Sequence, residues 1–141
     1  MQHALGPAAL GLAIVAIVAV YFYRKPVTLE NTLFAMAGAI KIKRVRKKRG
    51  RKTVSVMSDA FGKFKIEERP DFTTILIKVS GCRGCIRIWI GHDGGMQFRY
   101  STWFWSTRRQ RIHEADAEVI RRFVARVRAA IETGADAKAR V

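Results

Sequence analysis

A run of twenty apolar residues, Ala4 to Tyr23 (ALGPAALGLAIVAIVAVYFY), limits what this chain can fold into more than any other feature of its sequence. It holds no charged residue. A helix of that length, at about 1.5 Å per residue, covers roughly the 30 Å hydrocarbon core of a bilayer. Pro7 falls in the first turn, where a missing N–H does least harm. The run predicts a single transmembrane helix within residues 1–25.

Two alternatives fit the run less well. A cleaved signal peptide carries positive charge before its apolar stretch and small residues at its cleavage site, whereas MQH precedes this run and AVYFYRK ends it. A buried core helix shows a polar face, and this run has none. The residues expected to anchor the chain in the membrane are Leu10, Leu12, Ile14, Val15, Ile17, Val18, Tyr21, Phe22 and Tyr23.

The charges that flank the run predict its orientation. Arg24 and Lys25 follow it directly, and almost no positive charge precedes it. By the positive-inside rule, the N-terminus lies outside and the C-terminal domain lies on the cytoplasmic or an equivalent interior side. A reducing compartment disfavours a disulfide between Cys82 and Cys85, and two cysteines are too few for a disulfide framework.

A polybasic segment lies downstream, at Lys41 to Lys52 (KIKRVRKKRGRK), and contains no acid. The whole chain carries 27 Lys and Arg against 11 Asp and Glu, a net charge of +16. Such an excess attracts polyanions, either nucleic acid or the anionic face of a membrane. Close to a transmembrane helix, the segment would hold the chain against anionic lipid head groups.

The positive excess continues far from the predicted anchor, because arginines recur through residues 99–128. The planar fork of arginine suits phosphate, so nucleic acid is a second expected partner, while a solvated helix face is the alternative for the last of these arginines. The residues predicted to bind a polyanion are Lys41, Lys43, Arg44, Arg46, Lys47, Lys48, Arg49, Arg51, Lys52, Arg99, Arg108, Arg109 and Arg111.

The pattern between these features predicts an α+β fold. Residues 26–40 favour a short amphipathic helix with Thr28 as its N-cap, although a strand beginning near Ile40 is an alternative. A period of two follows, which predicts an antiparallel meander of four to five strands. The predicted strands are 52–57, 63–69, 72–80, 86–90 and 96–105, joined by turns such as Asp93-Gly94.

The last predicted element is a C-terminal helix that packs on the meander. Its apolar face consists of Val119, Ile120, Phe123, Val127 and Ile131. The predicted organisation is thus an anchor at 1–25, a juxtamembrane amphipathic and polybasic segment at 26–52, a soluble α+β domain at 53–134 and a tail at 135–141.

Two short motifs resemble parts of metal-binding, redox or catalytic sites but lack the other residues that such sites need. GCRGC has the spacing of a metal or redox pair, but a structural zinc site needs four ligands, and the positions of His92 and His113 match no familiar finger. GHDGG places His92 beside Asp93, yet neighbouring strand residues point to opposite faces. We therefore expect structural cysteines, no cofactor, no metal and no enzymatic activity, with metal or redox use of Cys82 and Cys85 as the lesser alternative.

An aromatic cluster lies near the end of the predicted meander, interleaved with Arg99. Strand alternation would send half of its rings into the core, but aromatics among arginines can also stack nucleobases or lie at lipid head groups. Its members are Phe98, Tyr100, Trp103, Phe104 and Trp105.

The sequence as a whole predicts a non-enzymatic single-pass membrane protein whose basic domain binds polyanions, namely anionic lipid head groups and nucleic acid. The alternative is a small structural or accessory subunit of a membrane protein assembly or of a membrane-containing virion. Such a subunit would contact other proteins through the aromatic cluster and the C-terminal helix.

Overall fold

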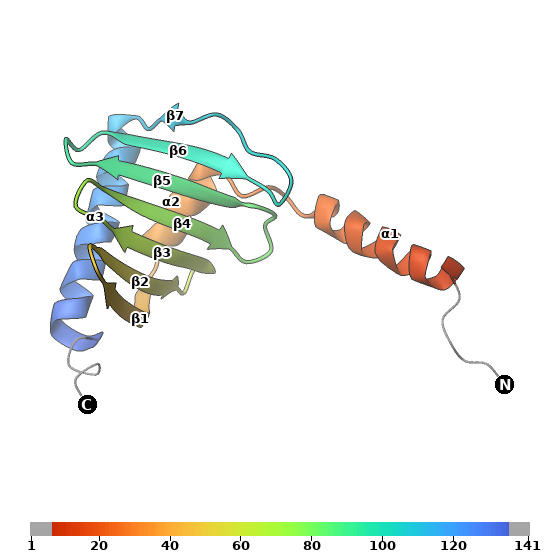
Figure 1. Cartoon of the computed structure of the whole chain (residues 1–141), viewed down its shortest axis with the longest axis horizontal. Coiled ribbons are helices and arrows are strands. Elements are labelled where there is room, and N and C mark those ends of the chain that lie inside the picture. Colours follow the sequence, from red (N-terminus) through yellow and green to blue (C-terminus); the bar gives the residue numbers. More distant parts are fainter. Residues whose placement is uncertain (1–6, 136–141) are drawn as a thin grey trace.

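A computed structural model describes residues 7–135 of the chain. Residues 1–6 of the predicted anchor and residues 136–141 of the predicted tail lie outside the described residues, as do the side chains of Tyr21, Phe22 and Tyr23. The rest of the chain forms three α-helices, one closing π-turn and a single antiparallel sheet (Figure 1).

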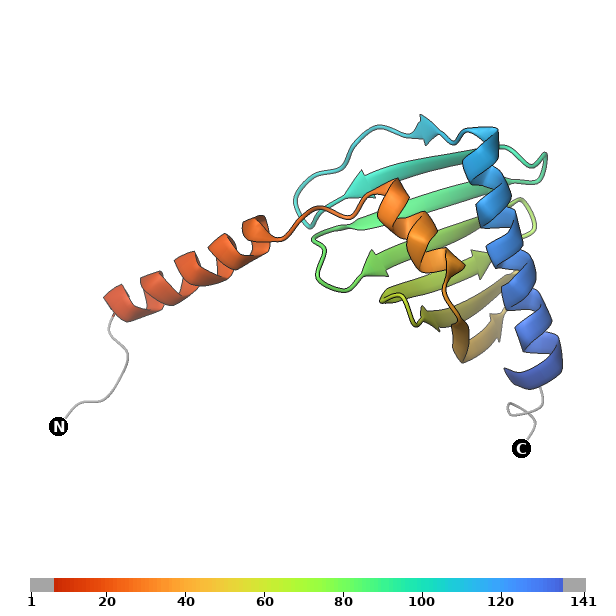
Figure 2. The ribbon, with the colours of Figure 1, turned by 180° about the vertical axis from the view of Figure 1, so that it is seen from behind.

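The N-terminal helix, α1 (Pro7–Tyr23), has 17 residues and projects away from the sheet (Figures 1 and 2). At 1.5 Å per residue it is about 26 Å long, shorter than the hydrocarbon core. Within residues 7–135, no helix combines the length and the apolar character needed to cross a membrane. The predicted transmembrane helix is therefore wrong, and so is the single-pass, N-terminus-outside location derived from it.

The predicted anchor side chains on α1 lie exposed along the helix. Their exposed fractions range from 45% to 72%, for Leu10, Leu12, Ile14, Val15, Ile17 and Val18.

The sheet has seven strands in sequence order, each antiparallel to the next. The predicted four to five strands are too few, so the predicted fold class is wrong in this respect as well. The strands are β1 (Ile40–Lys48), β2 (Arg51–Ser58), β3 (Gly62–Glu68), β4 (Phe72–Val79), β5 (Cys85–Gly91), β6 (Met96–Ser101) and β7 (Gln110–Arg111).

The first strand of the sheet is the polybasic segment, and it begins at Ile40, where the sequence prediction gave a strand only as an alternative. β1 pairs with β2 along its whole length, with a bulge between Ile42 and Arg44. A tight turn at Arg49-Gly50 joins them, and Gly50 takes a positive φ of 64° that glycine adopts at little cost. The alternation Ile40, Ile42, Val45 that marks this strand is shifted by the bulge, which hides its period of two.

Two helices cover one face of the sheet, where one was predicted (Figure 2). The first, α2 (Leu29–Ala37), begins as expected at Thr28, whose Oγ1 accepts a hydrogen bond of 3.1 Å from the backbone N–H of Asn31. The second, α3 (Glu114–Ala130), continues into a π-helical turn at Ile131–Ala135. The structure thus places residues 26–52 within the folded unit, as α2 and β1.

The core lies between this helical layer and the sheet. Pairing aligns apolar residues in rows across the strands, for example Val54, Ile66, Ile75 and Ile88. On α3 and the π-helical turn that follows it, four of the five residues predicted to form the apolar face are buried: Ile120, Phe123, Val127 and Ile131. The rings of Phe64 and Phe123 lie 4.6 Å apart, centroid to centroid, and join the two layers.

We predict that Phe123→Ala lowers the free energy of unfolding by about 3–5 kcal/mol, because it leaves a cavity between α3 and β3. The side chain of Phe123 is 1% exposed. The matched control is Phe34→Ala on α2, a ring that is 74% exposed and whose loss should change stability by less than about 0.5 kcal/mol. Urea unfolding of both variants measures the difference, and equal losses would contradict the layer arrangement described here.

Candidate functional site

The face of the sheet opposite the helices carries no covering element among residues 7–135, and Figure 1 looks onto it. We call it the open face. Its side chains are those that alternate with the core residues, so the pairing register aligns them in rows as well. The middle row crosses all seven strands: Arg46, Thr53, Glu67, Thr74, Trp89, Gln97 and Arg111.

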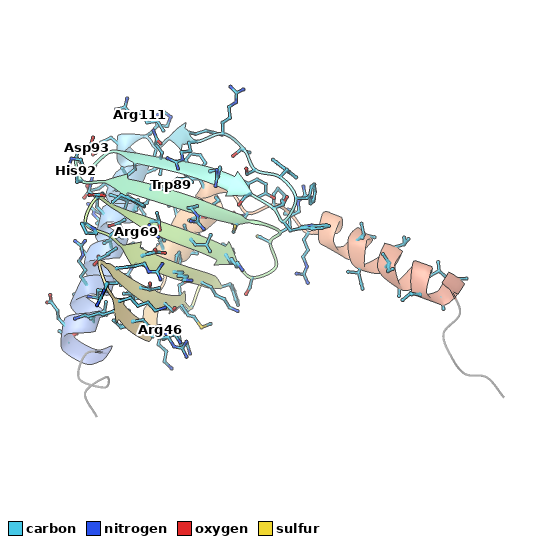
Figure 3. All side chains as sticks on the ribbon, in the orientation of Figure 1. Arg46, Arg69, Trp89, His92, Asp93 and Arg111 are labelled. Carbon is cyan, nitrogen blue, oxygen red and sulfur yellow. The ribbon has the colours of Figure 1, made fainter. Side chains whose placement is uncertain are left out.

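Two further rows lie one after the other on the same side of the middle row, and every strand contributes at least one basic side chain to the open face (Figure 3). One row is Arg44, Ser55, Lys65, Leu76, Arg87 and Arg99. The other is Lys41, Met57, Lys63 and Lys78. Lys48 and Arg51 continue the face at the turn between β1 and β2.

These cations are largely uncompensated. Among the described residues, the only ion pair on the open face is built on Glu67, which lies 3.4 Å from Arg51 and 2.7 Å from Arg69. Arg44, Arg46 and the lysines of the face have no acidic partner in the part of the chain that the structure describes. The open face therefore presents a continuous positive surface.

The arginines of α3, on the other side of the molecule, are engaged within the protein. Arg121 and Arg122 form ion pairs with Glu118 at 3.0 and 3.3 Å, and Arg128 pairs with Glu68 at 3.1 Å. Arg126 donates to the carbonyl oxygens of Met36 and Gly38, at the end of α2. The arginines on the two sides of the molecule thus differ in charge compensation.

Glu67 is the one carboxylate of the strand residues described on the open face. Its Oε1 accepts hydrogen bonds from Nε and Nη2 of Arg69 at 2.9 and 2.7 Å and from Nη1 of Arg51 at 3.4 Å. The hydrogen bonds from Arg69 are the main cause that lowers the pKa of Glu67 below its ordinary value of 4.5. Glu67 is therefore charged at neutral pH and neutralised by its neighbours.

The open face is hollowed at two places. One depression, of about 290 Å³, lies over β1 to β3 and is lined mostly by basic and hydroxyl side chains. Its lining residues are Arg44, Arg46, Lys48, Arg51, Thr53, Ser55, Lys65 and Glu67. This depression offers guanidinium and ammonium groups together with hydroxyl donors, a set that suits phosphate oxygens.

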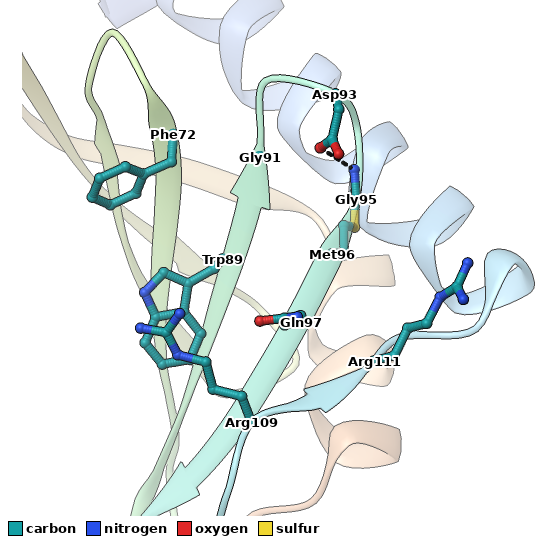
Figure 4. A pocket seen from close by; sticks show the side chains of 9 residues that line it. All are labelled: Phe72, Trp89, Gly91, Asp93, Gly95, Met96, Gln97, Arg109 and Arg111. Atoms are coloured by element: carbon teal, nitrogen blue, oxygen red, sulfur yellow. Dashed lines mark hydrogen bonds between the residues drawn. The ribbon is translucent and has the colours of Figure 1, made fainter.

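The second hollow, of about 600 Å³, lies at the opposite side of the sheet, around Trp89 (Figure 4). The guanidinium carbon of Arg109 is 3.9 Å from the centre of the Trp89 ring, a cation–π stack. Arg99 approaches the same ring at 5.2 Å. Phe72, Gln97 and Arg111 complete the side-chain lining, and the turn at Gly91–Gly95 forms one edge.

The structure separates the residues that were predicted to bind a polyanion. Lys41, Arg44, Arg46, Lys48, Arg51, Arg99, Arg109 and Arg111 share the open face. Lys47 and Lys52 pair on the helical side of the sheet, Lys43 lies at the bulge, Arg49 is in the turn, and Arg108 is exposed in the β6–β7 connection.

The residues predicted to bind a polyanion did not include several members of the open face: Lys63, Lys65, Lys78, Arg87 and Trp89. Each alternates with apolar residues inside a predicted strand. That alternation was the available signal, but the charges are far apart in sequence, and only the register brings them together.

The aromatic cluster divides into two parts. Phe98 and Tyr100 pack partly buried against the core. Trp103, Phe104 and Trp105 lie in the β6–β7 connection, where Trp103 is 79% exposed. Hydrogen bonds hold this connection, including one of 2.8 Å from the backbone N–H of Thr102 to the carbonyl of Trp105.

The histidine motif lies in the β5–β6 turn, and the cysteine motif spans the β4–β5 connection and the first residue of β5. Cys82 and Cys85 are free thiols, and Cys85 Sγ lies 3.3 Å from Ser101 Oγ. Asp93, in the turn labelled in Figure 3, accepts a hydrogen bond of 3.0 Å from the backbone N–H of Gly95. In the stretch from residue 7 to residue 135, no cluster of three or more His, Cys, Asp and Glu residues is placed to hold a metal ion.

Comparison with known proteins gives no relative for this arrangement. No protein-family model matches the chain. No curated protein matches it. No solved structure matches it.

We predict that Glu67 gives the fold a pH-dependent stabilisation. Because its folded-state pKa lies below 4.5, the contribution is present above pH 4.5 and is lost as the pH falls through the folded-state value. The difference in free energy of unfolding between the wild type and Glu67→Gln should shrink as the pH falls from 7 to 3. Arg69→Ala removes the main cause and should weaken the same dependence, whereas a difference that does not change with pH would contradict this assignment.

Proposed function

We propose that this chain binds nucleic acid through the open face of its sheet. The observation that carries the proposal is the set of uncompensated cations contributed by all seven strands, with Glu67 as the one carboxylate among the described strand residues of that face. The phosphodiester backbone of a nucleic acid is a polyanion whose charges repeat over a length that matches the row of cations on the open face.

The dimensions of the face support a polymer over a single anion. Neighbouring strands lie about 4.8 Å apart, so the middle row from Arg46 to Arg111 runs over roughly 29 Å. One strand of a nucleic acid carries a phosphate about every 3.4 Å of duplex axis, so several phosphates meet the face at once. Their bound counterions are released on contact, which supplies the free energy of binding.

The side chains between the cations favour the same partner. Arginines provide planar forks for two phosphate oxygens, and Thr53 and Ser55 add hydroxyl donors in the depression over β1 to β3. Lipid head groups were expected because the sequence predicted a membrane anchor next to the polybasic segment. That prediction is wrong, so this reason for preferring lipid over nucleic acid no longer applies. Binding without catalysis stays our expectation for this chain.

We predict that Arg44→Ala combined with Arg46→Ala weakens binding to a labelled nucleic acid and lowers its salt dependence. The slope of log affinity against log salt should fall in magnitude by roughly one for each cation removed from a phosphate. Fluorescence anisotropy of the full chain, between 50 and 200 mM salt, measures both quantities.

The matched control is Arg121→Ala combined with Arg122→Ala, which removes the same net charge from the helical side. This pair should leave the slope almost unchanged, because its guanidinium groups already meet Glu118. Equal losses in the two double variants would mean that net charge alone drives binding and would contradict the assignment to the open face. Binding to acidic vesicles but to no nucleic acid would contradict the proposed function itself.

A further inference from the structure

We propose that the stack of Trp89 and Arg109 is a nucleobase site, and that the chain therefore binds single strands in preference to duplexes. This inference rests on the proposed function and adds to it the part of the polymer that is recognised. It concerns the 600 Å³ hollow at the β5–β7 side of the open face, a volume within the usual range of about 300–1,000 Å³ for ligand sites.

The geometry of the stack provides a flat platform. Trp89 is half-buried on β5, and the Arg109 guanidinium lies over its indole, 3.9 Å from the ring centre (Figure 4). The ring covers the side of the guanidinium that lies against it, and both side chains line the hollow. Arginine planes held in this way stack nucleobases, as aromatic rings do.

The side chains around the platform can read the edge of a base. Gln97 pairs with Trp89 across β5 and β6 and carries both a donor and an acceptor on its amide. Arg111, paired with Gln97 from β7, adds further donors. Phe72 supplies an apolar wall on the far side of Trp89 (Figure 4).

An anion site adjoins the platform. Arg87 and Arg99 are directly opposite each other on β5 and β6, a pairing of like charges that destabilises the sheet when nothing lies between them. Nε of Arg99 is buried and has no hydrogen-bond partner among the described residues. A phosphate that contacts both side chains relieves this repulsion between Arg87 and Arg99. A base platform beside a phosphate site matches one nucleotide of a chain.

This arrangement selects against duplexes. In a duplex each base is already paired and stacked between its neighbours, so it reaches the platform only after leaving the helix. In a single strand the bases are free to turn toward the sheet, and stacking on an exposed plane costs little.

The test uses two substitutions that separate the effect of the planar guanidinium group of Arg109 from the effect of its positive charge. Arg109→Lys keeps the charge and removes the plane, and Arg108→Lys makes the same exchange one residue earlier, outside the hollow. The probes are a labelled single strand that spans the face, an abasic strand of equal length and charge, and a duplex. Anisotropy of the full chain reports the affinity for each probe.

We expect the wild type to bind the base-bearing strand more tightly than the abasic strand or the duplex. Arg109→Lys should weaken binding to the base-bearing strand by roughly 5- to 150-fold, the range for one stacked base, and leave the abasic strand within about twofold. Arg108→Lys should change neither. Trp89→Phe keeps a ring under the guanidinium and should retain most of the affinity, whereas Trp89→Leu should not.

Equal affinity of the wild type for the base-bearing and abasic strands would overturn the inference and leave the proposed function intact. An equal loss on both strands in Arg109→Lys would overturn it too, because Arg109 would then act through charge alone. Trp89 emission, isolated by Trp103→Phe and Trp105→Phe, separates the remaining cases. If a nucleoside monophosphate quenches this emission but no strand binds, the base site is supported and the proposed function is contradicted. If neither the nucleoside monophosphate nor any strand produces a response, both the base site and the proposed function are contradicted.

Discussion

The continuous register of the seven-stranded sheet is the constraint on which the rest of the structure depends. Successive residues of a strand point to opposite faces, so a register that aligns Ile66 with Ile75 on one face must align Lys65 with Leu76 on the other. Helices α2 and α3 bury the first face. When the helices bury the first face, the basic residues of separate strands are left together on the second face. The same strand register therefore produces both the core and the charged surface.

Charge compensation then distinguishes the two sides of the molecule. The helical side holds its arginines in ion pairs or against carbonyl oxygens, as Arg128 does with Glu68 and Arg126 with Gly38. The open face leaves its cations without acids, apart from the group around Glu67. Repulsion among these cations works against the fold, and the buried rows of isoleucine and valine offset it. An anionic partner would remove that repulsion when it binds.

Much of the domain could be predicted from local patterns, because those patterns follow local physics. Thr28 marks the start of α2, and the spacing of Ile120, Phe123 and Val127 gives the buried face of α3. The bulge in β1 broke the alternation, and the density of charge there suggested a segment that lies against anionic lipid head groups. The face on which each cation lies is set by the folded chain as a whole. Charges were sought where they cluster in sequence, whereas the sheet assembles them from distant strands.

The two outermost strands also decide how far this sheet extends. A free sheet edge is a template onto which another chain can add a strand. On one side the edge is β1, which is dense in lysine and arginine and twisted by its bulge, and on the other it is β7, which is only two residues long. Both are features by which proteins prevent edge-to-edge aggregation. The polybasic strand β1 therefore helps to limit the sheet to its seven strands, independently of the partner that the open face binds.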